Sequence, residues 1–162
     1  MRFFDILFSG FAICALSPFF LIIIIILLIT GEHKVFYFQD RVGKGGELFR
    51  LFKFTTMTSN SMNMGTGAIT VKDDPRILPF GFFLRKTKIN ELPQLLNIFV
   101  GHMSVIGPRP QTPRCFSVFP IESRNTITQV RPGLSGIGSI IFRSEEDILQ
   151  GSGQIEFYDN VI

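Results

Sequence analysis

The hydrophobic pattern begins with one long apolar stretch. Residues 6–31 contain no charged side chain, and residues 22–26 are five consecutive isoleucines. At about 1.5 Å per residue, a helix over 6–29 would be roughly 36 Å long, enough to cross a hydrocarbon core of about 30 Å. The absence of a polar face argues against a buried helix of a soluble protein, and the length argues against a cleaved signal peptide. We therefore predict a membrane-associated segment over residues 1–32.

A Ser-Pro pair lies near the middle of this stretch. Pro18 has no N–H to donate to the carbonyl of Cys14, and the residue before a proline, Ser17, is disfavoured in helical geometry. In a membrane the freed backbone groups need partners, which the Ser17 hydroxyl can supply in part. Two geometries stay open at this point: a kinked single span, or a helix-break-helix that enters and leaves by the same face. The positive-inside rule places the basic residues that follow in the cytoplasm in either case.

The pattern then changes to short alternating segments. Residues 35–39 favour a strand, residues 40–46 contain glycines and favour a turn, and residues 47–54 alternate polar and apolar side chains. We therefore predict a β-hairpin over residues 35–54, with Lys53 on the polar side of its second strand.

Helical patterns follow in the second half of the chain. Residues 77–85 suit a helix that ends in basic side chains. Residues 90–101 suit another, with Asn90 as the N-cap, Pro93 in the first turn and Gly101 as the stop. Asn90 and the residue after it would then lie at the positive pole of that helix, where backbone N–H groups favour a phosphate.

Two arginines are each held beside proline. Arg109 lies between two prolines, of which Pro108 is the first, and Arg131 stands before a proline that is followed by Gly133. A rigidly held guanidinium suits paired hydrogen bonds to phosphate, and glycine allows a close backbone approach. Together with Lys53 and the helix start, these residues indicate a diphosphate site.

The charge distribution also indicates an anionic partner. Residues 33–131 carry 14 Lys and Arg against six Asp and Glu, a net charge of +8, whereas the whole chain has +3. No nucleic acid is expected, because no recognition motif is present and the prolines beside Arg109 and Arg131 fit poorly with a helix in a DNA groove. Cys14 and Cys115 cannot make a disulfide framework, and no Cys or His spacing resembles a zinc site.

Five motifs follow one another in a fixed order. They are the apolar segment with Ser17-Pro18, Lys53-Phe54-x-x-Met57, Asp74-Pro75-Arg76 leading to Leu84-Arg85-Lys86, the run over residues 90–110, and Arg131-Pro132-Gly133-Leu134-Ser135-Gly136. In this order they resemble the bacterial sugar transferase family, the small monotopic polyprenyl-phosphate phosphoglycosyl transferases. The resemblance covers nearly the whole chain, and residues 91–110 are its most specific part.

The resemblance implies an activity and a location. Such enzymes transfer a phospho-sugar from a UDP-sugar to undecaprenyl phosphate, with release of UMP, at the cytoplasmic face of the bacterial inner membrane. This is the first membrane step of surface glycan assembly, such as exopolysaccharide biosynthesis, and its product passes to downstream glycosyltransferases. The family also implies a re-entrant N-terminal helix broken at Ser-Pro, and an Asp-Glu pair that works with Mg²⁺ and whose Asp carries a covalent phospho-sugar.

Three positions depart from the family pattern. Asn90 stands where the family has its nucleophilic Asp, and a neutral amide is a poor nucleophile and a weaker Mg²⁺ ligand than a carboxylate. Glu91 is retained, while His102 replaces an acidic residue and Thr55 an arginine. Three alternatives follow: Glu91 carries the covalent or metal role alone, transfer is direct, or the protein is a catalytically silent relative that binds polyprenyl phosphate or a partner enzyme. Family members usually continue through another aromatic-rich segment, so we expect a form shortened at the C-terminus.

These observations predict a helix-rich α+β protein in two parts. A membrane-associated re-entrant helix occupies residues 1–32, and a cytosol-facing phosphoglycosyl transferase domain occupies residues 33–162. Both substrates are anionic, and phosphoryl transfer depends chiefly on charge neutralisation and alignment. The predicted site residues are Glu91, Asn90 and Lys53 for catalysis, Glu91 for Mg²⁺, Arg109, Arg131, Pro108 and Gly133 for substrate binding, and Ser17 and Pro18 for the membrane break.

Overall fold

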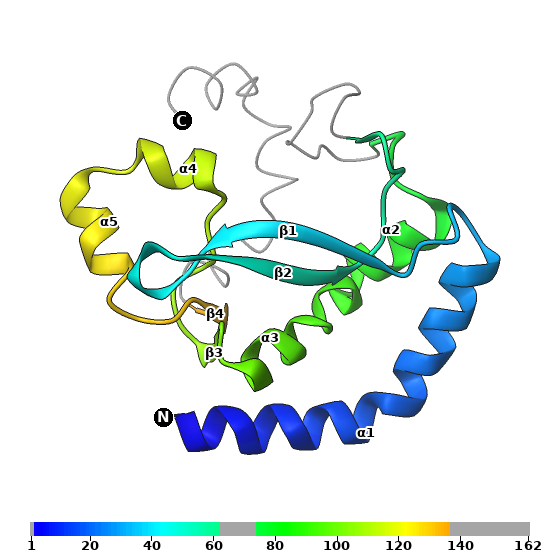
Figure 1. The fold of residues 1–162 in the computed structure, drawn as a ribbon. Helices are drawn as coiled ribbons and strands as arrows, with labels where there is room; N and C mark the ends of the chain where they lie inside the picture. The colour runs from blue at the N-terminus through cyan, green and yellow to red at the C-terminus, as the bar shows by residue number, and fades with distance from the viewer. Residues whose placement is uncertain (1, 62–73, 137–162) are drawn as a thin grey trace.

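The computed structural model describes residues 2–61 and 74–136 (Figure 1). The predicted helix-rich α+β class is confirmed. The elements, in chain order, are α1 (Arg2–Ile29), β1 (Phe36–Val42), the 3-10 turn η1 (Lys44–Gly46), β2 (Leu48–Phe54), α2 (Pro79–Lys86), the 3-10 turn η3 (Ile89–Glu91), α3 (Gln94–Val100), β3 (Ser104–Ile106), α4 (Pro113–Val118), α5 (Ile121–Ile127) and β4 (Gly133–Ser135).

The long apolar segment forms α1, which is bent near its middle (Figure 1). Pro18 lies inside the helix, and the Ser17 hydroxyl donates to the Cys14 carbonyl over 2.8 Å, as expected from the sequence. The backbone nevertheless stays helical through the Ser-Pro pair, so the predicted break is a bend. The physical reason is that proline removes a single backbone hydrogen bond of the helix, and the serine hydroxyl partners the freed carbonyl.

Both halves of α1 lie against the rest of the described protein. In the first half, Asp5 Oδ1 accepts hydrogen bonds from Ser104 Oγ at 2.8 Å and from the Val105 N–H at 3.0 Å, both in β3. In the second half, Ile23 and Leu27 are buried against β2 and α2. The helix is therefore joined to the same body at both ends.

The predicted hairpin is confirmed. β1 and β2 pair antiparallel, with Tyr37 opposite Lys53. Lys53 was predicted on the polar side of its strand, but it shares the face of β2 that carries the buried Phe49 and Leu51, because alternate residues of a strand point to the same side. The chain turns through η1, where Gly45 and Gly46 adopt positive φ angles of 72° and 80°. The hairpin crosses the middle of the molecule, with α2 near one end and α4 and α5 near the other (Figure 1).

Two apolar clusters flank the hairpin. One joins β2 to α3 and the other joins β2 to α1 and α2. The first consists of Phe49, Leu51, Leu95, Ile98 and Met103, and the second of Ile23, Leu27, Phe54 and Leu84. β2 contributes to both clusters, so the strand that carries Lys53 is fixed by the core on two sides.

The helix predicted to begin at Asn90 is divided in two. η3 contains Asn90 and Glu91, and α3 begins only at Gln94, with Pro93 at its N-cap position and no side-chain cap. Asn90 is therefore not the predicted N-cap. The physical reason is the left-handed conformation of Lys88, with φ of 59°, which starts a separate turn before the proline. Gly101 ends α3 with φ of 107°, as predicted.

A small parallel pair, β3 with β4, joins the two proline-rich loops. Gly133 N–H donates to Pro108 O over 2.9 Å, and Gly107 N–H donates to Ser135 O over 3.0 Å. A Cβ on Gly133 would overlap the backbone nitrogen of Gly107, so only glycine fits there. These three-residue strands carry no alternation, which is why the sequence did not predict them.

Candidate functional site

The centre of the candidate site is an ion pair between β2 and η3. Lys53 Nζ lies 3.5 Å from Glu91 Oε1, and the two side chains are 21% and 35% exposed. β2 directs Lys53 to this side, and η3 directs Glu91 toward it. Partial burial strengthens charge interactions relative to open water while leaving the pair open to a ligand.

Two arginines add positive charge around this pair. Burial lowers the pKa of Lys53 below its ordinary value, Glu91 raises it, and Arg41 and Arg109 each lower it further. Burial likewise lowers the pKa of Arg41, and the charge of Arg109 contributes to that lowering. Arg41 and Arg109 thus lie within electrostatic range of the Lys53–Glu91 pair, and three cations near one carboxylate favour an additional anion.

Arg41 was predicted to lie in a turn and was not among the predicted site residues. In the structure Arg41 lies in β1, where Nη1 donates to Pro110 O over 3.0 Å and Nη2 donates to Gln39 Oε1 over 2.6 Å. Its Nε is buried and has no partner among residues 2–61 and 74–136. The period-two spacing of Gln39 and Arg41 was the available signal, because it puts both on the face of the hairpin that carries Lys53.

Arg41 also holds the loop that carries Arg109. Besides the Arg41–Pro110 hydrogen bond, Val42 N–H donates to Gln111 O over 2.9 Å. These two contacts tie the loop to the end of β1. Arg109, although exposed, is thereby kept close to Lys53.

The predicted binding residues occupy two places. Arg109 lies with Lys53 and Glu91, whereas Arg131 Nε donates to Gly101 O over 2.8 Å, at the end of α3. Pro108 and Gly133 bond to each other through their main chains. These contacts of Arg131, Pro108 and Gly133 hold loops and a helix end, and their binding of substrate stays a prediction.

A second guanidinium also lies at the end of α3. Arg2, in the first turn of α1, donates to the carbonyls of Ile98 and Phe99, the latter over 2.5 Å. Cations at this position complement the negative pole of a helix. Arg2 and Arg131 therefore hold the end of α3 from two directions.

Asn90 stands directly before Glu91 and is 7% exposed. Its Oδ1 is buried and accepts no hydrogen bond within the described part of the chain. A buried amide oxygen without a donor costs free energy unless a ligand supplies its partner.

These residues fit a magnesium ion that is shared with a substrate. Glu91 offers a carboxylate and Asn90 a free amide oxygen, while Asp5 and Asp74 are already bound by β3 and by Arg76. Across residues 2–61 and 74–136 no cluster of three His, Cys, Asp or Glu could hold a metal. Mg²⁺ is commonly bound by one or two carboxylates plus substrate phosphates, which matches this small donor set.

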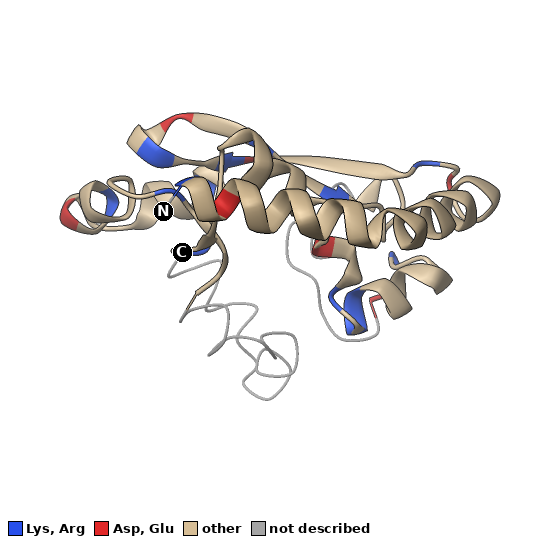
Figure 2. Ribbon diagram, turned by 90° about the horizontal axis from the view of Figure 1, so that it is seen from below, with Lys and Arg blue, Asp and Glu red and all other residues tan. Residues whose placement is uncertain are grey.

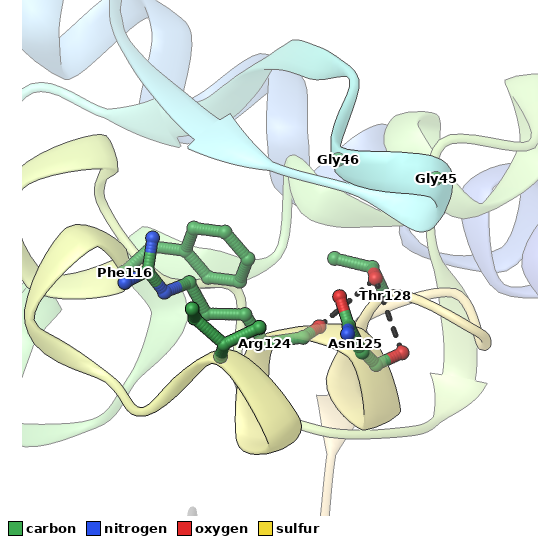
Figure 3. A pocket seen from close by; sticks show the side chains of 7 residues that line it. Gly45, Gly46, Phe116, Arg124, Asn125 and Thr128 are labelled. Atoms are coloured by element: carbon green, nitrogen blue, oxygen red, sulfur yellow. Dashed lines mark hydrogen bonds between the residues drawn. The ribbon is translucent and has the colours of Figure 1, made fainter.

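Two shallow cavities lie away from the ion pair. One, of about 250 Å³, lies between the hairpin turn and the α4–α5 region, as Figure 3 shows; it is lined by Gly45, Gly46, Phe116, Ile121, Arg124, Asn125 and Thr128. The other, of about 230 Å³, lies at the junction of α1 and α2. Neither of these two cavities is lined by Lys53, Glu91 or Arg109, so the candidate site is identified here by its charged residues.

The outer side of α1 is apolar and exposed. Among the described helices α1 is long and apolar enough to cross a membrane by length and composition, with a mean hydropathy of 3.1 over 18 residues and 11% of that window buried. Its ribbon carries charged residues only near the N-terminal end (Figure 2). Large exposed side chains on it include Phe3, Phe4, Leu7, Phe8, Phe11, Leu21, Ile22, Ile25, Leu28 and Ile29. A surface of this kind needs a lipid or protein cover.

Known proteins are similar in sequence to this chain over most of its length. The Bacterial sugar transferase family profile matches residues 1–159. The exopolysaccharide production protein PSS of Rhizobium leguminosarum bv. phaseoli is 42% identical over 108 residues, which are 67% of this chain and 54% of that protein. ExoY of Sinorhizobium fredii is 34% identical, over 89% of this chain and 70% of that protein.

A third relative is named for its activity. The putative undecaprenyl-phosphate N-acetylgalactosaminyl 1-phosphate transferase of Bacillus subtilis is 38% identical over 112 residues, 69% of this chain and 62% of that protein. The chain thus spans between about half and two thirds of the length of several relatives that it matches. Taken with the profile that matches residues 1–159, these similarities show that the chain belongs to the bacterial sugar transferase family.

Proposed function

We propose that this protein transfers a phospho-sugar from a UDP-sugar to undecaprenyl phosphate and releases UMP. The observation that carries the proposal is the group of Lys53, Arg41 and Arg109 around Glu91. A diphosphate donor and a lipid phosphate bring several negative charges together, and three cations against one carboxylate can neutralise them. The names of the relatives supply the lipid acceptor and the exopolysaccharide context.

The reaction exchanges one phosphoanhydride bond for another. The bond between the β-phosphorus and the oxygen that bridges to the α-phosphate breaks, and UMP leaves with that oxygen. A phosphate oxygen of the lipid forms the new bond to the β-phosphorus. Lys53 and Arg109 bind and orient the phosphates, and Arg41 keeps Arg109 in place through Pro110.

Glu91 supplies the carboxylate of the site. A bound Mg²⁺ would be held by Glu91, the Asn90 amide oxygen and substrate phosphates, and would neutralise charge on the diphosphate. The ion pair with Lys53 keeps the Glu91 carboxylate in the site, and no other hydrogen bond within the described part of the chain engages it. Glu91 is therefore available to a metal or to the phospho-sugar.

We also propose that α1 is re-entrant and that its two ends lie on the cytoplasmic side. Arg2 and Asp5 bind α3 and β3, and the chain after Ile29 leads into β1 of the same body. A helix that crossed the bilayer would carry one end away from that body. The bend and the exposed apolar side chains suit a helix that dips into one leaflet and returns.

The test is a UMP-release assay on the full chain in lipid nanodiscs, with a panel of UDP-sugars. Release is expected only when a UDP-sugar, undecaprenyl phosphate and Mg²⁺ are all present. The variant Glu91→Gln keeps the size of the side chain but removes its charge, and should abolish release. Full turnover by Glu91→Gln would overturn the role assigned to Glu91.

Asn90 supports a second candidate, a catalytically silent relative that binds polyprenyl phosphate or a partner enzyme such as a downstream glycosyltransferase. The same assay with Asn90→Asp separates the two functions. A large gain in UMP release would indicate that the native chain is a silent form. A loss would show that the amide belongs to a working site.

A further inference from the structure

The side chain of Asn97 in α3 bonds to the backbone of β2. Asn97 is 0% exposed. Its Oδ1 accepts a hydrogen bond from the Phe52 N–H over 3.0 Å, and its Nδ2 donates to the Arg50 carbonyl over 2.7 Å. A neighbouring strand would offer the same acceptor and donor, so one amide takes the place of a third strand at this edge of the hairpin.

The main chain of Asn97 is fixed as strongly as its side chain. Its carbonyl accepts hydrogen bonds from the N–H groups of Gly101, His102 and Met103, at 3.1, 2.9 and 3.2 Å. These bonds close the end of α3. The backbone position from which the side-chain amide reaches β2 is therefore fixed.

Asn97 connects the two segments that carry the ion pair. Phe52 is the residue before Lys53 in β2, and Glu91 lies six residues before Asn97, in the turn that leads into α3. The other contacts between α3 and β2 in this region are apolar, and apolar contacts are not directional. The two hydrogen bonds of Asn97 are directional, so they fix the position of α3 along β2.

We infer that Asn97 is a positioning residue that holds Lys53 and Glu91 in alignment for phospho-sugar transfer, an inference that rests on the proposed function of that pair. Only an amide of this length offers one acceptor and one donor to the same strand edge. Leucine would leave both backbone groups unpartnered, and an ionised aspartate would place a second acceptor against the Arg50 carbonyl.

The experiment compares Asn97→Leu and Asn97→Asp with Ile98→Ala in the full chain in nanodiscs. Ile98 is the matched control, because it is also 0% exposed in α3 and lies in the apolar cluster shared with β2. Each variant is measured for thermal stability, for kcat and KM of UMP release, and for the through-space NMR contact between Lys53 and Glu91 in protein with ¹³C-labelled lysine and glutamate.

Asn97→Leu should lower kcat about 100-fold while KM changes by less than about threefold, because misalignment affects the reacting groups more than binding. The NMR contact between Lys53 and Glu91 should be lost, because Glu91 would no longer be held beside Lys53. Ile98→Ala should lose thermal stability yet keep the native kcat and this NMR contact. Asn97→Asp should regain turnover at acidic pH, where a protonated carboxyl can donate to Arg50 O.

The inference is overturned if Asn97→Leu, or Asn97→Asp should the leucine variant not fold, matches Ile98→Ala in kcat and in the NMR contact between Lys53 and Glu91. The NMR measurement keeps this test separate from the proposed function. If native protein releases no UMP with any donor, the proposed function fails, and the NMR contact still decides whether Asn97 aligns the pair.

Discussion

At the residue scale, the site depends on charges that the fold holds close together. Lys53 is the clearest case, because burial and two nearby arginines lower its pKa while a single glutamate opposes them. Lys53, Glu91 and Arg109 were predicted from local motifs and the family resemblance, and the structure brings Lys53 and Glu91 into contact. Sequence reasoning missed Arg41 and Asn97, because their roles depend on contacts with Pro110 and with β2, which are distant in the sequence.

The lowered pKa of Lys53 predicts an alkaline limb in the pH profile. Activity should fall as Lys53 loses its proton, at a pH below the ordinary lysine value of 10.5. Lys53→Arg should move this limb to higher pH, because a guanidinium stays protonated. Lys53→Met should reduce kcat/KM by about 100-fold or more. The measurement is kcat/KM against pH for the three proteins.

The lowered pKa of Lys53 also affects the free energy of unfolding. Between the folded pKa of Lys53 and the ordinary lysine pKa, the unfolded chain binds more protons than the folded one, so stability should rise with pH across that window. Lys53→Arg is the control that should abolish this rise. For activity, an alkaline limb of kcat/KM against pH that is identical in the native protein and in Lys53→Arg would contradict the assignment of that limb to Lys53.

At the scale of elements, the sequence predicted those features that depend on neighbouring residues alone. The hairpin and the end of α3 at Gly101 follow from alternation, glycine and helix-stop chemistry, and Ser17 bonds to the carbonyl that proline leaves free. The division between η3 and α3 was not predicted, because it depends on a left-handed Lys88. β3 and β4 were not predicted either, since their pairing joins segments about thirty residues apart.

The close contact between β3 and β4 predicts that a single methyl group added at Gly133 lowers stability. Gly133→Ala would place a Cβ against the backbone nitrogen of Gly107, closer than any real Cβ contact, so the loops must separate. We expect a loss of about 1–3 kcal/mol in the free energy of unfolding, as in other overpacked sites. Thermal and urea denaturation in detergent would measure it.

The matched control for that substitution is Gly45→Ala. Gly45 also has a demanding backbone, with φ of 72°, but a Cβ added at this position of the hairpin turn would meet no atom within 4 Å. Its cost should be limited to conformational strain of about 1 kcal/mol. Equal losses for the two variants would show that crowding between the loops is not the cause.

At the scale of the whole molecule, α1 and the rest of the described protein form one body. The helix buries one side against α2, α3, β2 and β3 and leaves a long apolar side uncovered (Figure 2). The sequence predicted the membrane association of this helix but could not choose between a span and a re-entrant form. The contacts at both ends of α1 support the re-entrant form that we propose.

This arrangement predicts the membrane topology. Single-cysteine reporters at residues 1 and 40 should react with a membrane-impermeant reagent from the same side, because both ends of α1 are tied to one domain. The experiment uses sealed inverted vesicles and intact cells in parallel, in a background where Cys14 and Cys115 are replaced by serine. Labelling from opposite sides would establish a span and contradict the re-entrant form.

The bond between Arg2 and the Ile98 carbonyl joins residues 96 positions apart. During synthesis the first turn of α1 leaves the ribosome long before its partner helix exists, so it must wait without that partner. Lipid is the surface available to the apolar stretch in that interval. We therefore predict that α1 enters the bilayer first and that its contact with α3 forms afterwards.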